Sequence, residues 1–191
     1  MAELTEIRWH ARAGQGAVTA SKLLAETALL KGNYIQSMPE YGPERTGAPL
    51  RAYSRISSEP IEVHNNIINP DIVVVLDETL LSIVDVLEGI SSQGILVINS
   101  ADSPDTVRAT IGAAPGIKVA AVDASGIALD TIKRDIPNTP VVGALAYISD
   151  IVSVDDLKQN LINTFGKKFS QQLIDANLES VDRAVKEVQV A

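Results

Sequence analysis

Residues 8–32 read "RWHARAGQGAVTASKLLAETALLKG" and place a strand-like segment, two glycines and a helical pattern in that order. The pattern predicts a strand at 6–10 and a helix at 16–31, with Gly32 where a helix ends. Gly14 and Gly16 predict a tight turn that lets the backbone approach a ligand closely. Two interpretations stay open: the helix's first N–H groups bind an anion such as a phosphate, or the turn only connects strand to helix.

The rest of the chain alternates strand and helix patterns. Three continuous apolar runs are typical of strands buried on both faces of a parallel sheet: "PDIVVVLD" (70–77), "ILVINS" (95–100) and "IKVAAVD" (117–123). Strands are also predicted at 34–38 and 50–57, with a short edge strand at 60–64. Helices are predicted at 78–88, about 126–134, 139–152, 153–165 and 169–189, with Ser153 and Asp156 as a capping box.

This alternation predicts an α/β fold, namely a Rossmann-like, doubly wound, mostly parallel sheet with helices on both faces, forming a single domain over residues 1–191. The carboxyl ends of parallel strands meet at one edge, where ligands of such sheets bind. Asp77, Asn99 and Asp123 each close a buried strand, and helix capping is the role we expect for them.

Composition excludes several classes of function. The chain has no cysteine, which excludes disulfides, thiolate nucleophiles, zinc–thiolate sites and ordinary iron–sulfur clusters on this chain. No run of about 18 apolar residues free of charge occurs, and the N-terminus has no apolar segment of the signal-peptide kind, so neither a membrane span nor a signal peptide is expected. The net charge of −8 argues against nucleic acid as a partner.

The charge is unevenly distributed. Residues 1–60 carry a net charge of +1 and residues 61–191 carry −9. The arginines of the first part flank two glycine-bearing loops: Arg8, Arg12, Arg45, Arg51 and Arg55. They are either a local basic face for an anionic ligand or ordinary solvated charge.

Nucleotide-binding and catalytic motifs fit poorly. In the dinucleotide pattern G-x-G-x-x-G the third glycine is Thr19 here, and Lys22 is misplaced for a P-loop. His10 and His64 are the only histidines, and no hydrolase or metalloprotease pattern includes them. We therefore predict no metal site and no catalytic residue on this chain.

A second loop carries more chemistry than a connector needs. Residues 39–49, "PEYGPERTGAP", hold Glu40, Tyr41, Glu44 and Arg45 between prolines and glycines. These side chains either form part of a site or form a Glu–Arg pair that staples the loop to itself.

Taken together, "RWHARAGQGAVTASKLLA" (8–25) and "PEYGPERTGAPLRAYSRI" (39–56) resemble the gamma subunits of the 2-oxoacid:ferredoxin oxidoreductases, those of the pyruvate enzyme most of all. The likeness extends through "NPDIVVVLDETLL" (69–81) and covers nearly the whole chain. The family usually has G-R-G-G-Q-G where this chain has A-R-A-G-Q-G, so Ala11 and Ala13 replace two glycines. Thr46 stands where arginine or glycine is common.

The resemblance implies that thiamine diphosphate and Mg²⁺ lie between alpha and beta subunits and that 4Fe-4S clusters lie in beta and delta subunits. It implies a cytoplasmic complex that converts pyruvate, coenzyme A (CoA) and oxidised ferredoxin to acetyl-CoA, CO₂ and reduced ferredoxin. The gamma chain would cover the active site and admit CoA. The residues carried over for this role are Arg12, Gly14, Gln15, Gly16, Glu44, Arg45 and Gly47.

Three alternatives to this reading remain at the level of sequence. The first alternative is a stand-alone Rossmann-like nucleotide-binding enzyme, and the second is a purely structural interaction subunit. The third alternative keeps the family and changes the substrate, to 2-oxoglutarate or a branched-chain 2-oxoacid.

Overall fold

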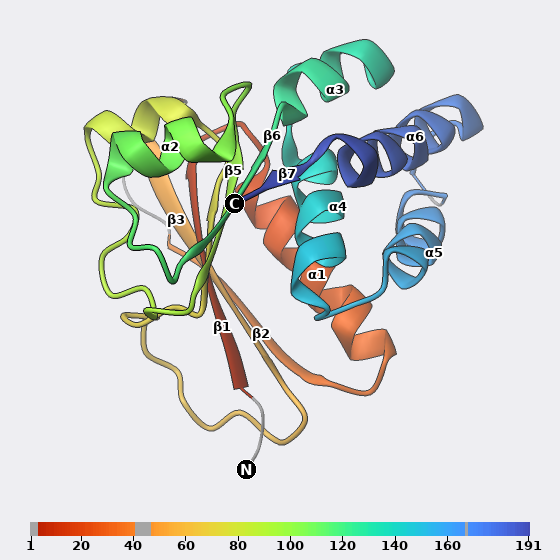
Figure 1. Cartoon of the computed structure of the whole chain (residues 1–191). Coiled ribbons are helices and arrows are strands. Elements are labelled where there is room, and N and C mark those ends of the chain that lie inside the picture. The colour runs from red at the N-terminus through yellow and green to blue at the C-terminus, as the bar shows by residue number, and fades with distance from the viewer. Residues whose placement is uncertain (1–3, 41–46, 167) are drawn as a thin grey trace.

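The computed structural model describes residues 4–40, 47–166 and 168–191. All seven of its strands join one sheet in the order β2-β3-β1-β4-β5-β6-β7 (Figure 1). The strands are β1 (Leu4–Arg12), β2 (Tyr34–Pro39), β3 (Pro49–Ser57), β4 (Ile72–Val75), β5 (Ile95–Asn99), β6 (Lys118–Val122) and β7 (Gln189–Val190). The helices are α1 (Ala17–Leu30), α2 (Pro104–Ile111), α3 (Ala124–Thr131), α4 (Asn138–Ser149), α5 (Val154–Phe165) and α6 (Gln171–Glu187), with a 3₁₀ helix η1 (Glu78–Ser82).

The centre of the sheet is parallel and its two margins are antiparallel. β1, β4, β5 and β6 run in the same direction, with Ile7 beside Ile72 and Ile72 beside Ile95. β3 pairs antiparallel with β1 and β2, and β7 pairs antiparallel with β6. The predicted α/β architecture, with apolar strands at the centre of a mostly parallel sheet, is confirmed.

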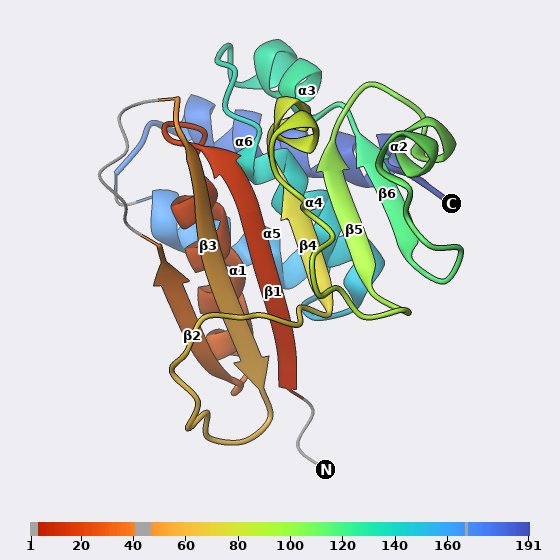
Figure 2. The same cartoon turned by 90° about the vertical axis from the view of Figure 1, so that its left-hand side faces the viewer.

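Helices cover both faces, as predicted, but unequally (Figure 1). One face packs under α1, α3, α4, α5 and α6, with Trp9, Val74 and Leu145 in its core. The other face packs under η1 and α2 around Val73, Ile98 and Val107. Figure 2 shows η1 and α2 in front of β4, β5 and β6, and the described residues place no helix in front of β1, β3 and β2.

Two predicted elements are wrong. Residues 60–64 form no strand. They could not pair with β3, whose two edges are taken by β1 and β2, and Pro60 has no backbone N–H to donate to any other edge. The helix predicted at 78–88 is only η1, followed by turns. In those turns the Asp85 carboxylate accepts a hydrogen bond from the Leu87 N–H at 3.0 Å, a local bond that competes with helix formation.

Two further elements had escaped sequence reasoning. α2 has clear end signals, with Ser103 accepting from the Thr106 N–H, Pro104 in the first turn and Gly112 with positive φ at the end. β7 is a two-residue strand whose pairing with β6 no local pattern reveals. The N-cap predicted before α5 is confirmed, since Ser153 accepts from the Asp156 N–H at 3.1 Å. The other half of the predicted capping box differs, because the Asp156 carboxylate accepts from the Ser153 hydroxyl at 2.6 Å instead of from the Ser153 backbone N–H.

Candidate functional site

The two glycines shape the turn between β1 and α1. Gly14 has φ of 106° and Gly16 has φ of 84°, both in the region that favours glycine. The Gln15 N–H donates to the Arg12 carbonyl at 3.1 Å, and the Gln15 side-chain oxygen accepts from the Arg12 N–H at 2.7 Å. The side chain of Gln15 therefore folds back and closes its own turn.

The end of the second loop joins this turn directly. Gly47 donates its N–H to the Ala13 carbonyl at 3.0 Å, and the Ala13 N–H donates to the Ala48 carbonyl at 2.9 Å. Gly47 has φ of 89°, which again favours glycine. The two sequence motifs, separated by more than twenty residues, thus form one continuous backbone platform at the end of β1.

Side chains tie this platform to the end of β4. Gln15 donates to the Asp77 carboxylate at 2.7 Å, and Arg12 Nε lies 3.3 Å from the same oxygen. Arg12 also donates to Thr79 Oγ1 at 2.8 Å and to the Gly47 carbonyl at 3.0 Å. Asp77 caps η1 through the Thr79 N–H at 2.9 Å. The Arg12 guanidinium is therefore occupied by contacts within the chain.

The charge state of Asp77 follows from these contacts. Burial by itself raises the pKa of the Asp77 carboxyl, but hydrogen bonds from Thr79 and Gln15 and the charge of Arg12 outweigh it. The pKa is lowered below the ordinary value of 3.8. Asp77 is thus an anion at neutral pH, and it holds Arg12 and Gln15 in place.

The first turn of α1 has backbone N–H groups without an acceptor among the described residues. Gly16 is its N-cap residue and supplies no side chain, and among the described residues no acceptor meets the N–H groups of Ala17, Val18 and Thr19. The positive φ of Gly16 favours glycine, and a Cβ there would also meet Asn138 Nδ2 at 2.7 Å, so the Asn138 side chain would have to move. The helix end can offer N–H groups and the positive end of its dipole to an anion.

The structure brings together five of the seven residues that the resemblance implied: Arg12, Gly14, Gln15, Gly16 and Gly47. Glu44 and Arg45, together with Tyr41, lie outside the described residues. Sequence reasoning missed the part that Asp77 and Thr79 play, having assigned Asp77 to capping only. The signal that could have revealed this part was the position of Asp77 just after the carboxyl end of β4, because β4 is the parallel neighbour of β1.

All three predicted capping residues accept a hydrogen bond from the first turn of a helix, but Asn99 does so for a helix other than the next one along the chain. Asp77 caps η1, and Asp123 caps α3 through the Gly126 N–H at 2.8 Å. Asn99 does not cap the helix that follows its own strand, because Ser103 does so. Asn99 instead donates to the Leu76 carbonyl at 2.9 Å and accepts from the Ser125 N–H at 3.0 Å, so it links the end of β4 to α3.

Two of the five clustered arginines, Arg8 and Arg55, have no part in the exposed basic face that was one interpretation of their clustering. Arg8 and Arg55 are almost fully buried on the sheet face opposite α1. Arg8 donates to the carbonyls of Val86 and Glu88, and Arg55 pairs with Glu6 at 2.7 Å. Of the arginines on described residues, Arg12 is the one that contacts the glycine turn. Arg45 lies outside the described residues.

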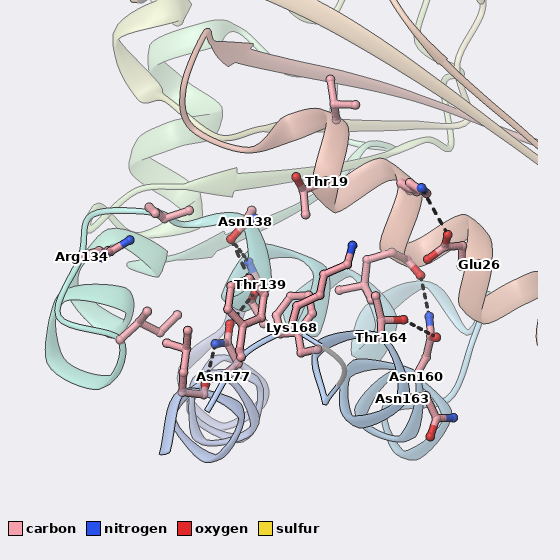
Figure 3. Close-up of a pocket in the computed structure, with 18 of the residues that line it drawn as sticks. Thr19, Glu26, Arg134, Asn138, Thr139, Asn160, Asn163, Thr164, Lys168 and Asn177 are labelled. Atoms are coloured by element: carbon pink, nitrogen blue, oxygen red, sulfur yellow. Dashed lines mark hydrogen bonds and ion pairs between the residues drawn. The ribbon is translucent and has the colours of Figure 1, made fainter. Parts of the chain in front are cut away.

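A cavity of about 1060 Å³ opens beside α1, on the helical side of the molecule (Figure 3). α1 forms one wall, and the α3–α4 connection, α5 and the start of α6 form the others. Thr19 and Asn138 lie at the end where α1 begins. Among the described residues no three His, Asp or Glu side chains gather as a metal-ligand set.

The family model described as pyruvate ferredoxin/flavodoxin oxidoreductase matches residues 6–187. The chain belongs to this oxidoreductase family. The resemblance drawn from the two loop motifs is thereby confirmed.

Relatives within the pyruvate ferredoxin/flavodoxin oxidoreductase family match along almost their whole length. Pyruvate synthase subunit PorC of Thermotoga maritima is 51% identical over 183 residues, covering 96% of this chain and 94% of that protein. The pyruvate/ketoisovalerate oxidoreductases common subunit gamma of Pyrococcus furiosus is 39% identical over 180 residues, covering 94% and 97%. The crystal structure of pyruvate oxidoreductase subunit PORC from Thermotoga maritima aligns with a TM-score of 0.87 and 46% identity, covering 99% of both chains.

The helices of the described residues were also compared with the requirements of a membrane-spanning helix. None of their helices combines the length and the apolar character that crossing a bilayer requires.

Proposed function

We propose that this chain is the gamma subunit of a pyruvate:ferredoxin oxidoreductase, the complex that converts pyruvate, CoA and oxidised ferredoxin to acetyl-CoA, CO₂ and reduced ferredoxin. The observation that carries the proposal is the 51% identity to pyruvate synthase subunit PorC of Thermotoga maritima across 96% of this chain. The complex would work in the cytoplasm, and the chain would be inactive alone.

The cofactors of this reaction would belong to partner subunits. The chain contains no cysteine, so it has no thiolate with which to hold a 4Fe-4S cluster. We assign thiamine diphosphate and Mg²⁺ to alpha and beta subunits, and the clusters to beta and delta subunits. Ferredoxin would then meet the complex through those chains.

Pyruvate is the 2-oxoacid that we propose, because the Thermotoga maritima relative is named for pyruvate synthase. The Pyrococcus furiosus relative is named as a subunit common to pyruvate and ketoisovalerate oxidoreductases. A gamma chain shared by two such enzymes would not itself select the 2-oxoacid. Other chains would therefore discriminate pyruvate from a branched-chain 2-oxoacid or from 2-oxoglutarate.

The role proposed for this chain in the reaction is to cover the active site and admit CoA at the first turn of α1. The N–H groups of Ala17, Val18 and Thr19 have no acceptor among the described residues, and a phosphate or pyrophosphate oxygen of CoA is a suitable one. Gly14, Gly16 and Gly47 would keep the backbone free of Cβ atoms there. Arg12 and Gln15, held by Asp77, would position the turn, and Glu44 and Arg45 would belong to the covering loop.

A substitution at Thr19 tests this role without disturbing the fold. Thr19 is exposed in the first turn of α1, where an acidic side chain interacts favourably with the helix dipole but repels an anion. In the reconstituted complex we expect Thr19→Glu to raise the apparent KM for CoA roughly tenfold, since a charge-assisted contact is worth about 1.5–3 kcal/mol. The apparent KM for pyruvate should stay unchanged, and the melting temperature of the isolated chain should not fall.

Thr19→Gln is the matched control, because it has nearly the same shape without the charge. It should leave both Michaelis constants close to those of the unmodified complex. An unchanged CoA constant in a fully assembled Thr19→Glu complex would remove CoA from this helix end. The alternative of a purely structural subunit, which the internal contacts of Arg12 favour, predicts that outcome.

A further inference from the structure

The cavity beside α1 is a groove that follows the whole helix. Its α1 wall begins at Val18 and ends at Leu30, a rise of about 18 Å at 1.5 Å per residue. The facing wall is built from the α3–α4 connection and from the region where α5 ends and α6 begins. These dimensions match about three turns of another helix rather than a small molecule.

The polar groups at the base of this groove are already satisfied within the chain. Asn160 donates to Thr27 Oγ1 at 3.0 Å and accepts from Thr164 at 3.1 Å. Asn177 accepts from Thr139 at 3.0 Å and donates to the Leu173 carbonyl at 2.7 Å. Small-molecule sites orient their ligands with a few free polar groups. The base of this groove instead offers an apolar surface.

Large apolar side chains stand exposed along the groove. Leu29, Leu30 and Phe169 are 52%, 65% and 46% exposed. Leu29 and Leu30 end α1, and Phe169 lies just before α6, so exposed apolar side chains stand on both sides of the groove. Exposed apolar surface of this kind marks a place where another protein docks. Because helices form the groove and no strand edge lies in it, the matching mode is a helix laid into a groove.

The charge at the groove is opposite to that of the whole molecule. Lys22, Arg134 and Lys168 line it with Glu26 as the single acidic side chain, whereas the chain carries a net charge of −8. Glu26 is paired with Lys22 at 3.6 Å. Across the described residues, the side chains of Arg134 and Lys168 take part in no ion pair or hydrogen bond. Figure 3 shows the Lys168 amino group directed toward α1 across the groove.

We propose that this groove docks an amphipathic helix of a partner subunit, whose apolar face covers Leu29, Leu30 and Phe169 and whose acidic side chains meet Arg134 and Lys168. The proposal rests on the proposed function, since it takes the partner from the same oxidoreductase complex. Docking would cover the exposed leucines and supply the two cations with counter-charges.

Site-specific labelling tests the docking directly, because the natural chain has no cysteine. Leu30→Cys places a thiol in the groove, and Ile68→Cys places one outside it as a control. The two positions are almost equally exposed, at 65% and 66%. A maleimide should label both at similar rates in the isolated chain. In the complex with the alpha, beta and delta subunits, labelling of Leu30→Cys should slow at least tenfold. The labelling rate of Ile68→Cys, measured in the isolated chain and in the complex, corrects for any general change in the reactivity of the maleimide.

Charge reversal tests the acidic character of the partner. Arg134→Glu with Lys168→Glu should weaken the affinity of this chain for the remaining subunits at least tenfold at low salt, and less at high salt. Lys118→Glu with Lys186→Glu makes the same change in net charge at exposed positions outside the groove, and it should change the affinity less than twofold. Equal effects of the two double variants would overturn the charge pairing.

The outcomes separate this inference from the proposed function. If the unmodified chain neither assembles with those subunits nor supports pyruvate turnover, the proposed function fails and the docking inference fails with it. If an active complex assembles but Leu30→Cys reacts as fast as in the isolated chain, the docking inference alone is overturned. CoA, which the proposed function places at the first turn of α1, should leave labelling of Leu30→Cys in the isolated chain unchanged, because Leu30 lies about 18 Å further along the helix. Protection of Leu30→Cys by CoA would assign this end of the groove to a small ligand and would also overturn the inference.

Discussion

His10 shows how burial sets the charge of a single residue. It lies on β1, 2% exposed, with its Nε2 atom accepting a hydrogen bond from Arg8 Nε at 3.1 Å. Burial first, and then the positive charges of Arg8 and Arg51, lower the pKa of His10 to about 3 from 6.5. The imidazole is therefore neutral in the folded protein at physiological pH, and it serves as a hydrogen-bond acceptor for a buried guanidinium rather than as an acid or base.

The lowered pKa of His10 predicts how stability depends on pH. The unfolded chain binds a proton at His10 below about pH 6.5, while the folded chain does so only near pH 3. The contribution of neutral His10 to the free energy of unfolding is complete above pH 6.5. It is lost as the pH falls below 6.5, by up to about 1.4 kcal/mol per pH unit. His10→Gln keeps an acceptor for Arg8 and should lower the free energy of unfolding by about 1–3 kcal/mol at pH 7, measured with urea. The natural chain loses stability toward pH 4 and the variant does not lose it in this way, so the difference should vanish or change sign by about pH 4.

His64→Gln is the control for this titration, since His64 is exposed and contacts Gln36 at 2.9 Å. Its free energy of unfolding at pH 7 should differ from that of the natural chain by no more than about 0.5 kcal/mol, as for other exposed substitutions. Parallel curves for His10→Gln and the natural chain between pH 7 and pH 4 would show that burial of His10 has no part in the acid sensitivity.

At the scale of elements, α4 is the centre of the helical layer. Most of its residues are buried, and it contacts α1, α3, α5 and α6 as well as the sheet. A helix surrounded on nearly all sides has no polar face, which explains the almost uniformly apolar "TPVVGALA" (139–146). Gly143 allows the close approach to α6, because a Cβ there would lie 3.1 Å from Val181 Cα and 3.2 Å from Val181 Cγ1.

The packing of α4 on α6 predicts that Gly143→Val destabilises the fold. Its branched side chain cannot fit against the backbone of α6 without moving one helix, so we expect a loss of about 1–3 kcal/mol in the free energy of unfolding. Ala109→Val, at an exposed position of α2, controls for helix propensity and should cost about 0.5 kcal/mol. A Gly143→Val chain as stable as the Ala109→Val chain would contradict the tight α4–α6 contact.

At the scale of the whole molecule, the absence of cysteine predicts the behaviour of the purified chain. Without thiolates it cannot hold an iron–sulfur cluster in the ordinary way, so we expect no visible absorption band. It should also show no pyruvate-dependent reduction of viologen until the other subunits are added. An absorption spectrum and a viologen assay, each recorded before and after addition of the partner subunits, check both expectations. Robust turnover by the chain alone would contradict the role of a subunit.

The sequence by itself determined the parallel centre of the sheet and the helix that follows the glycine turn. Continuous apolar runs such as 72–75 specify strands buried on both faces, and periodicity specifies helices, because both signals are local. The two loop motifs also identified the family, which the family match confirms. The predicted roles of the loop residues toward CoA stay predictions.

Only the tertiary structure decided which segments meet. The strand predicted at 60–64 did not form, and the preceding strand β3 pairs with β1 and β2 instead, a choice of partners about which local pattern carries no information. Gln15 reaches Asp77 because β1 and β4 pair in parallel register, although 62 positions separate the two residues. Arg8 and Arg55 became buried for the same reason, since strand pairing selects the face of the sheet on which each side chain lies. Contacts between distant residues depend on register and layer packing, and these are properties of the folded chain as a whole.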